Sequence, residues 1–194
     1  MSLARQALNL PNLISLSRLG LVAVFVWLVF GADQIGWAGV LLGIIGGTDW
    51  IDGYLARRLG QVTELGTFLD PLADRLAVAV SVVVGLVVGV LPSWFAWALI
   101  VREALIGIGA LYGWTRGVRR LDVRRLGKLA TLLLYFSITG FYLGRGFQLP
   151  GLVAAAYLVG VPGLVAYYAV GVQYLTDMRV AVGGVGSDGG EQVS

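Results

Sequence analysis

The sequence contains neither cysteine nor histidine. It therefore offers no disulfide scaffold, no thiolate zinc site, no Ser-His-Asp triad and no imidazole acid–base chemistry. A metal ion would need oxygen ligands, and a general base would be a carboxylate or a less usual group. Charge is also scarce, at 13% of 194 residues against about 25% in an ordinary soluble domain, whereas 58% are hydrophobic. A water-soluble core cannot hide that much apolar surface.

The apolar residues fall into six stretches, each close to the roughly 20 residues that cross ~30 Å of hydrocarbon as a helix. We expect helices at about 13–31, 35–57, 67–90, 94–115, 127–146 and 152–175. The predicted fold is an all-α integral membrane protein, a bundle of six transmembrane helices with a short N-terminal juxtamembrane segment. Residues 1–180 form one predicted domain, and the Gly-rich residues 181–194 are predicted to be a disordered tail.

Basic residues predict the orientation of this bundle. Most of them lie before the first span, after the second, between the fourth and fifth, and after the sixth, whereas the opposite loops hold only Asp33 and Arg145. The positive-inside bias makes the basic side cytoplasmic, together with both termini.

Glycine is abundant, with 29 residues. Four pairs have GxxxG spacing inside the predicted spans: Gly43/Gly47, Gly85/Gly89, Gly109/Gly113 and Gly140/Gly144. Such pairs let helix backbones approach closely. They favour tight packing within the chain, with a dimer interface as the alternative.

Four aspartates stand within 26 residues of apolar surroundings: Asp49, Asp52, Asp70 and Asp74. Each charged side chain in a membrane costs at least ~2.5–3.5 kcal/mol, so the group requires a compensating partner or a function. On helices the first two share a face, and so do the last two. The second and third spans run in opposite directions around a short loop, so both pairs should meet near the cytoplasmic end of a helical hairpin. Pro71 either kinks the third span or takes its first position, with Asp70 as the N-cap.

Four carboxylates in one place repel one another unless cations lie between them. Mg²⁺ or Mn²⁺ suits an all-oxygen site, and two such ions ~3.5–4 Å apart form the clamp used for in-line displacement at phosphorus. Small neighbours, Gly53, Ala56 and Gly66, leave a shallow surface where a flat nucleotide could lie, and Arg57 can reach a phosphate.

A basic cluster precedes the fifth span: Arg116, Arg119, Arg120, Arg124, Arg125 and Lys128, with Asp122 as its one acid. Arg125 and Lys128 would share a helical face and could bind an anionic acceptor. The alternative explanation is the positive-inside bias alone.

The run Asp49-x2-Asp52-Gly53-x2-Ala56-Arg57-x8-Gly66-x3-Asp70-x3-Asp74 resembles the full motif of the CDP-alcohol phosphatidyltransferase family. The resemblance implies a homodimeric phospholipid-synthesis enzyme of the plasma membrane. Its active site would face the cytoplasm and transfer a phosphatidyl group from CDP-diacylglycerol to an alcohol, releasing CMP. It implies that the first three aspartates ligate two metal ions holding the pyrophosphate, and that Asp74 shares in metal binding or acts as general base. The motif's Gly and Ala residues would border the cytidine nucleotide.

Three further segments resemble phosphatidylglycerophosphate synthases and the related cardiolipin synthases: residues 8–18, Val101-Arg102-Glu103, and residues 126–131. The former enzymes usually carry a second lysine where Ala130 stands, and the alanine is closer to the cardiolipin group. We favour glycerol-3-phosphate as acceptor because the basic cluster suits a dianionic headgroup. Phosphatidylglycerol and an inositol phosphate are the alternatives.

A divalent-cation transporter is the alternative from a different class. It would need a polar pathway to the far side of the membrane. Every aspartate within the spans falls near the cytoplasmic end, and the outer parts of spans three, five and six offer only apolar and small residues.

Overall fold

A computed structural model describes the backbone of residues 10–59, 64–116 and 125–188, and the side chains of residues 17, 19–47, 75–116 and 126–180. Over the described residues the chain forms six α-helices and no strand, which confirms the predicted all-α fold class. The helices are α2 (Leu10–Phe30), α3 (Ile35–Leu59), α4 (Glu64–Val87), α5 (Ser93–Thr115), α6 (Arg125–Gly146) and α7 (Pro150–Asp188).

Three of these helices are long and apolar enough to cross a membrane, over Ser93–Thr115, Leu126–Gly146 and Pro150–Val180. In α2, α3 and α4, the apolar segments found among the described residues are shorter, at Leu19–Phe30, Ile35–Gly47 and Arg75–Val87. Large apolar side chains lie on the outside, among them Trp114, Leu158 and Val180, at 70%, 77% and 73% exposure. Such a surface is expected where a protein meets lipid rather than water.

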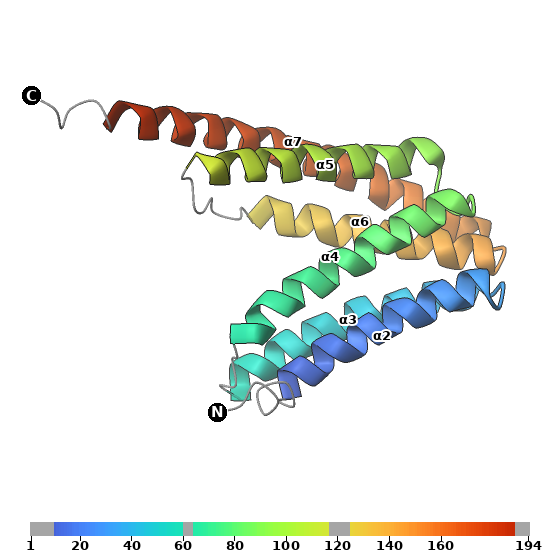
Figure 1. The fold of residues 1–194 in the computed structure, drawn as a ribbon. Helices are drawn as coiled ribbons and strands as arrows, with labels where there is room; N and C mark the ends of the chain where they lie inside the picture. The colour runs from blue at the N-terminus through green and yellow to red at the C-terminus, as the bar shows by residue number, and fades with distance from the viewer. Residues whose placement is uncertain (1–9, 60–63, 117–124, 189–194) are drawn as a thin grey trace, which may run out of the picture.

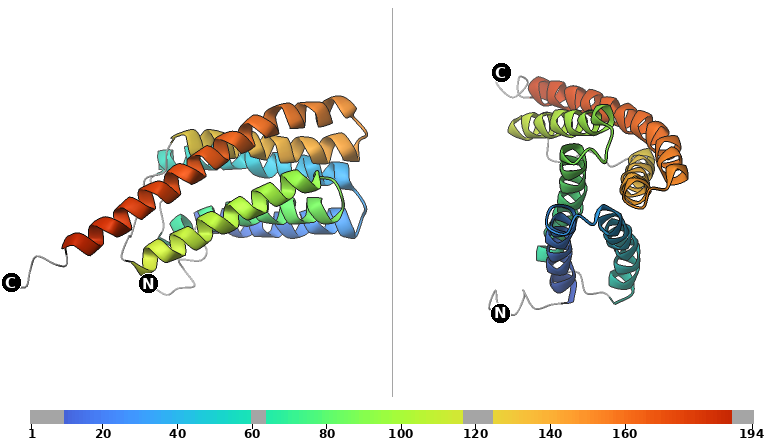
Figure 2. Two further views of the ribbon diagram at one scale, coloured as in Figure 1. Left: turned by 90° about the horizontal axis from the view of Figure 1, so that it is seen from above. Right: turned by 90° about the vertical axis from the view of Figure 1, so that its right-hand side faces the viewer.

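The six helices form a closed ring. Around it, α2 packs on α3, α3 on α6, α6 on α7, α7 on α5, α5 on α4, and α4 on α2, while α4 also touches α6 across the ring (Figure 2). The turns from α2 to α3, α4 to α5 and α6 to α7 all lie at one end of the molecule, called here the turn end (Figure 1). The starts of α2, α4 and α6 and the ends of α3, α5 and α7 lie at the opposite end, where the helix axes spread apart (Figure 1). We call this second end the aspartate end, because the aspartates of α3 and α4 fall in its half of those helices.

The turn end is closed by short, hydrogen-bonded connections. Asp33, Gly89 and Gln148 adopt positive φ angles of 52°, 71° and 56°, one in each turn. Arg145 Nη1 donates a hydrogen bond to the Gly89 carbonyl at 2.8 Å, so the end of α6 is tied to the turn between α4 and α5.

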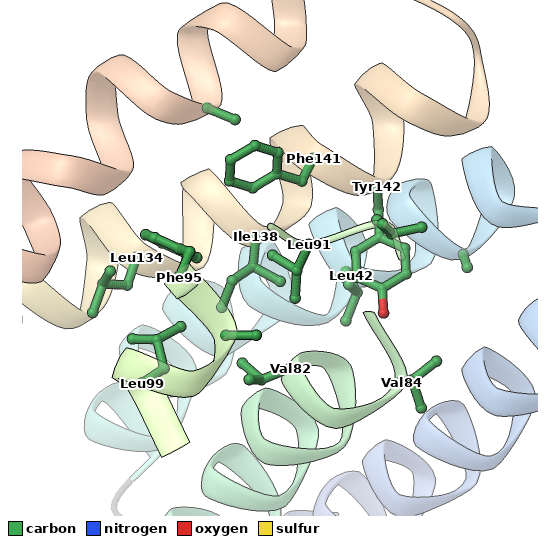
Figure 3. Packing of buried hydrophobic residues seen from close by; sticks show 14 of the residues in the cluster. Leu42, Val82, Val84, Leu91, Phe95, Leu99, Leu134, Ile138, Phe141 and Tyr142 are labelled. Atoms are coloured by element: carbon green, nitrogen blue, oxygen red, sulfur yellow. The ribbon is translucent and has the colours of Figure 1, made fainter. Parts of the chain in front are cut away.

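Among the described side chains, the main buried cluster lies toward the turn end (Figure 3). Tyr142 and Phe141 of α6 are fully buried at its centre. The Tyr142 ring meets Phe25 of α2 edge-on at 5.3 Å, and its hydroxyl donates to the Ser81 carbonyl of α4 at 2.8 Å. One α6 side chain therefore links two other helices.

Two of the four glycine pairs pack against α7. A Cβ on Gly140 would lie 3.1 Å from Cβ of Ala156, and one on Gly144 would lie 2.8 Å from the Val153 nitrogen. The pair Gly109/Gly113 faces Leu175 and Met178 in the same way. Close packing within the chain is thus confirmed for both pairs.

The other two pairs behave differently from this expectation. The pair Gly85/Gly89 does not share a helix, because α4 ends at Val87 and Gly89 belongs to the following turn. In the pair Gly43/Gly47, a Cβ on Gly43 would meet a Thr139 methyl group at 3.7 Å, whereas one on Gly47 would meet nothing within 4 Å.

The last helix is longer than its apolar pattern predicted. It continues to Asp188, so residues 181–188 are helical, whereas the sequence suggested a disordered tail from residue 181. Extending an existing helix avoids the cost of nucleation, so a Gly-rich segment can continue one although it would not start one. Residues 189–194 lie outside the described part of the chain.

Candidate functional site

The four aspartates lie on two helices of the ring. Asp49 and Asp52 belong to α3, and Asp70 and Asp74 belong to α4. Both helices are continuous through these positions, so spacings of three and four residues keep each pair on one face of its helix. The side chains themselves lie outside the described ones. Metal ligation by these four residues therefore stays a prediction.

The backbone puts the aspartates at matching depths. Asp52 stands seven residues before the end of α3 at Leu59, and Asp70 six residues after the start of α4 at Glu64, about 10 Å along each helix. Asp49 and Asp74 each stand ten residues from the same helix ends, about 15 Å. Since residues 60–63 alone connect the helices, those two ends lie within about 19 Å of each other. The acidic residues thus form two tiers at one end of the ring.

Pro71 lies within α4 and does not begin it. The helix starts at Glu64, seven residues earlier, so the N-cap alternative for Asp70 is wrong. Because proline has no backbone N–H, the Thr67 carbonyl lacks its usual helical partner.

The two acid-bearing helices share a neighbour. Over the parts of the chain that the structure describes, α2 packs against both α3 and α4, and no packing of α3 on α4 is found there. The predicted opposite directions of α3 and α4 are confirmed (Figure 1). The meeting of their aspartate-bearing halves stays a prediction, because the side chains of residues 48–74 lie outside the described ones.

The residues predicted to bind substrates lie toward the same end. Gly53, Ala56 and Arg57 occupy the last part of α3, and Gly66 lies in the first turn of α4. Like the aspartates, these residues have side chains outside the described set, as does Arg125, the first residue of α6. Lys128 follows one turn later and is exposed.

The packing of α3 against α6 relates these basic residues to the acidic motif. A Cβ on Gly39 would meet Leu143, one on Gly43 would meet Thr139, and one on Gly46 would meet Tyr135. Each step toward the end of α3 therefore matches a step toward the start of α6.

Continued along the two helices, this antiparallel register brings Lys128 level with Tyr54 and Arg125 level with Arg57. Ala130, which is fully buried, comes level with Asp52. The predicted acceptor residues thus have the same depth as the predicted nucleotide-binding residues.

A second polar cluster lies at mid-depth between α5 and α7. Arg102 Nη1 and Glu103 Oε1 form an ion pair at 3.1 Å. The Tyr167 hydroxyl donates to the same Glu103 oxygen, and its ring centroid is 3.5 Å from Arg102 Cζ. The sequence contained no signal that would have identified Tyr167 as a partner of these two α5 residues.

Among the side chains that the structure describes, no three metal-ligating residues gather into one site. The motif aspartates on α3 and α4, which lie outside those side chains, stay the predicted all-oxygen cation site. Their chemistry suits a hard divalent ion.

The chain is similar to proteins of one family. The model of that family, described as CDP-alcohol phosphatidyltransferase, matches residues 8–173. A putative cardiolipin synthase of Mycobacterium tuberculosis is 36% identical over 179 residues, covering 91% of this chain and 86% of that protein. A cardiolipin synthase (CMP-forming) of Streptomyces coelicolor is 36% identical over 183 residues, covering 90% and 84%. A CDP-diacylglycerol–glycerol-3-phosphate 3-phosphatidyltransferase of Bacillus subtilis is 34% identical over 150 residues, covering 70% and 77%.

Proposed function

The chain belongs to the CDP-alcohol phosphatidyltransferase family, and we propose on this basis that it transfers a phosphatidyl group from CDP-diacylglycerol to glycerol-3-phosphate. The products would be phosphatidylglycerophosphate and CMP. The observation that carries the proposal is the complete aspartate motif, from Asp49 to Asp74, inside the matched residues 8–173. An enzyme of this family has no need of the transmembrane cation pathway that a transporter requires.

We propose that the ring is a six-span bundle in the plasma membrane, with the aspartate end toward the cytoplasm. The three long apolar helices and the exposed apolar surface support a membrane location. The orientation is supported by the basic residues at the aspartate end, such as Arg116 and Lys128. A homodimer is part of the proposal and rests on the family resemblance.

Asp49, Asp52 and Asp70 would hold two divalent cations, Mg²⁺ or Mn²⁺, with Asp74 completing the set. The donor chemistry fits, because carboxylate oxygens are the ligands these ions prefer. The matching depths of the four residues along α3 and α4 support a shared site. When bound, the cations would neutralise the pyrophosphate and stabilise the displacement at phosphorus.

The chain's own residues would then divide the remaining work. Gly53, Ala56 and Gly66 would let the cytidine nucleotide approach the helix backbones, and Arg57 would bind a phosphate. Asp74 would take the proton of the acceptor hydroxyl while the hydroxyl oxygen forms a bond to the phosphatidyl phosphorus. The bond from that phosphorus to the CMP oxygen breaks, and CMP leaves with the electron pair.

Arg125 and Lys128 would bind the acceptor. Their depth, level with Arg57 and Tyr54 in the α3–α6 register, supports a position beside the nucleotide site. Two cations at the start of α6 suit the phosphate of glycerol-3-phosphate better than a neutral alcohol.

Phosphatidylglycerol is the second candidate acceptor, and it would give cardiolipin. Ala130 favours it, because this position is fully buried and lacks the second lysine usual in phosphatidylglycerophosphate synthases. Two of the three relatives described above also carry the name cardiolipin synthase.

The test is to incubate purified protein with CDP-diacylglycerol, Mg²⁺ or Mn²⁺, and each acceptor separately: glycerol-3-phosphate, phosphatidylglycerol or inositol phosphate. We expect metal-dependent release of CMP with glycerol-3-phosphate and phosphatidylglycerophosphate as the lipid product. Cardiolipin as the sole product would contradict the acceptor assignment alone. Absence of CMP release with every acceptor would contradict the transfer itself.

A further inference from the structure

Arg102, Glu103 and Tyr167 form a charged group between α5 and α7 that the proposed reaction has not yet used. Arg102 and Glu103 lie in the middle of α5, a helix long enough to cross a membrane. Ionisable residues at that depth are costly and commonly functional. Their side chains are 12% and 51% exposed, so the arginine is the more enclosed partner.

Tyr167 fixes this pair from the neighbouring helix α7. Its ring lies against the guanidinium, with 3.5 Å between Arg102 Cζ and the ring centroid, and its hydroxyl bonds the carboxylate of Glu103. The carboxylate in turn holds Nη1 of Arg102 at 3.1 Å. The guanidinium is thus restrained on one face and at one of its nitrogens.

The opposite edge of the guanidinium consists of Nε and Nη2. Nε of Arg102 is buried and has no hydrogen-bond partner among the described residues. Gly171 of α7 lies beside this edge: a Cβ there would be at contact distance, 3.4 Å from Nε and 3.9 Å from Nη2, so the glycine leaves the space of about one methyl group. The Nε–Nη2 edge is one that arginine can present to an oxyanion with two parallel hydrogen bonds.

A second cation acts on this group. Among the described residues, Arg75 of α4 and Glu103 both act electrostatically on the Arg102 guanidinium. Arg75 directly follows Asp74, the proposed base. Since α4 also packs on α5, the helix that carries the proposed base is a direct neighbour of the helix that carries Arg102.

We infer that Tyr167 is a positioning residue for phosphatidyl transfer, which holds the Arg102 guanidinium so that its unpaired edge can bind a phosphate group of a substrate. The inference rests on the proposed function, because both CDP-diacylglycerol and the acceptor carry a phosphate. Tyr167 touches neither substrate in this scheme and acts through Arg102.

Three variants test the inference, with kcat and KM measured separately for CDP-diacylglycerol and for the acceptor. Tyr167→Phe keeps the ring and removes the bond to Glu103, and Tyr167→Leu removes both contacts. Tyr168→Phe is the matched control, since its hydroxyl donates to the Ala98 carbonyl at 2.8 Å and links the same two helices. All three variants are compared with wild type in thermal stability.

We expect Tyr167→Leu to raise the KM of one substrate about tenfold, and Tyr167→Phe to raise it less, because cation–π stacking and the hydroxyl bond both contribute. The control should leave both KM values unchanged. A rise for the acceptor assigns Arg102 to the acceptor phosphate, and a rise for CDP-diacylglycerol assigns it to the pyrophosphate; either supports the inference.

Unchanged KM values in both Tyr167 variants of an active enzyme would overturn the positioning role and leave the proposed function standing. An equal rise in Tyr168→Phe would also overturn it, because the effect would then be one of α5–α7 packing. If Tyr167→Leu does not fold, Tyr167→Phe decides by the same criterion. A wild-type protein that releases no CMP would overturn the proposed function, and the positioning role with it.

Discussion

The two ends of the helix ring differ in the residues that form them. At the turn end, short connections and buried aromatic residues hold the helices close, as in the links from Tyr142 to Phe25 and Ser81. At the aspartate end, the axes spread apart and the sequence supplies carboxylates on α3 and α4 and cations at the start of α6 (Figure 1). Among the described side chains, the main buried cluster thus lies toward the turn end, and the residues of the proposed chemistry lie toward the aspartate end. Substitutions at one end should change stability, and substitutions at the other should change turnover.

The largest expected effect is at the aspartate end. Asp49→Ala, Asp52→Ala and Asp70→Ala should each abolish CMP release and the thermal stabilisation by Mg²⁺ or Mn²⁺, because each removes a proposed ligand of one shared site. Double variants should lose no more than single ones, since such ligands act as a unit. Asp33→Asn at the turn end is the control, because asparagine tolerates its positive φ of 52°. Retained CMP release in any of the three alanine variants would contradict the two-metal site.

A somewhat smaller loss is expected at Asp74, the proposed base. Asp74→Asn should lower kcat roughly 10²–10⁴-fold, the usual contribution of a positioned proton acceptor. Binding of CDP-diacylglycerol, measured by titration of the purified protein, should change little. Near-normal turnover would make Asp74 a structural residue, and loss of nucleotide binding would make it chiefly a metal ligand.

At the turn end, the expected effect is on stability. Gly144→Ala would place a methyl group 2.7 Å from a Val153 methyl carbon and 2.8 Å from its backbone nitrogen. Overpacking of this kind costs about 1–3 kcal/mol, so Tm should fall while the KM values of the folded enzyme stay unchanged. Gly151→Ala is the matched control, since a Cβ there meets nothing within 4 Å and Tm should not fall. Equal Tm values for the two variants would show that the close approach does not hold the turn end together.

Much of the helix layout could be predicted from the sequence. Apolar runs bounded by Gly, Pro or charge predicted helices at 35–57, 94–115 and 127–146. The corresponding helices of the structure are Ile35–Leu59, Ser93–Thr115 and Arg125–Gly146. The spacing of apolar residues does not say which helix faces which. The contact of α3 with α6, and the contacts of α2 with both α3 and α4, therefore had to come from the structure.

The candidate site was predictable to a different extent. The aspartate motif is local in sequence, so its residues could be named and assigned to two helices from spacing alone. The Arg102–Glu103–Tyr167 group joins residues 64 positions apart, and nothing in the sequence distinguishes Tyr167 from other span tyrosines such as Tyr168. Contacts between distant helices are the part of this site that spacing cannot provide.

The smallest expected effect returns to the aspartate end and concerns the acceptor. Lys128 is exposed one turn into α6, at the depth of Tyr54. Lys128→Ala should raise the KM for glycerol-3-phosphate about tenfold, the loss of one charge-assisted contact, and leave the KM for CDP-diacylglycerol little changed. Arg125→Ala should act in the same direction. Initial rates with each substrate varied in turn measure both constants.

The control for Lys128 is Arg179→Ala, which removes one exposed positive charge from the aspartate-end half of α7. If Lys128 acts by contact, only Lys128→Ala should raise the acceptor KM. The difference in acceptor KM between the two variants should then persist when salt is added. If it acts through net charge, both should raise it equally, because long-range attraction depends on total charge and is screened by salt. Equal effects on both substrates, or none, would return Lys128 to the positive-inside explanation, and the acceptor contact would have to come from elsewhere on the ring.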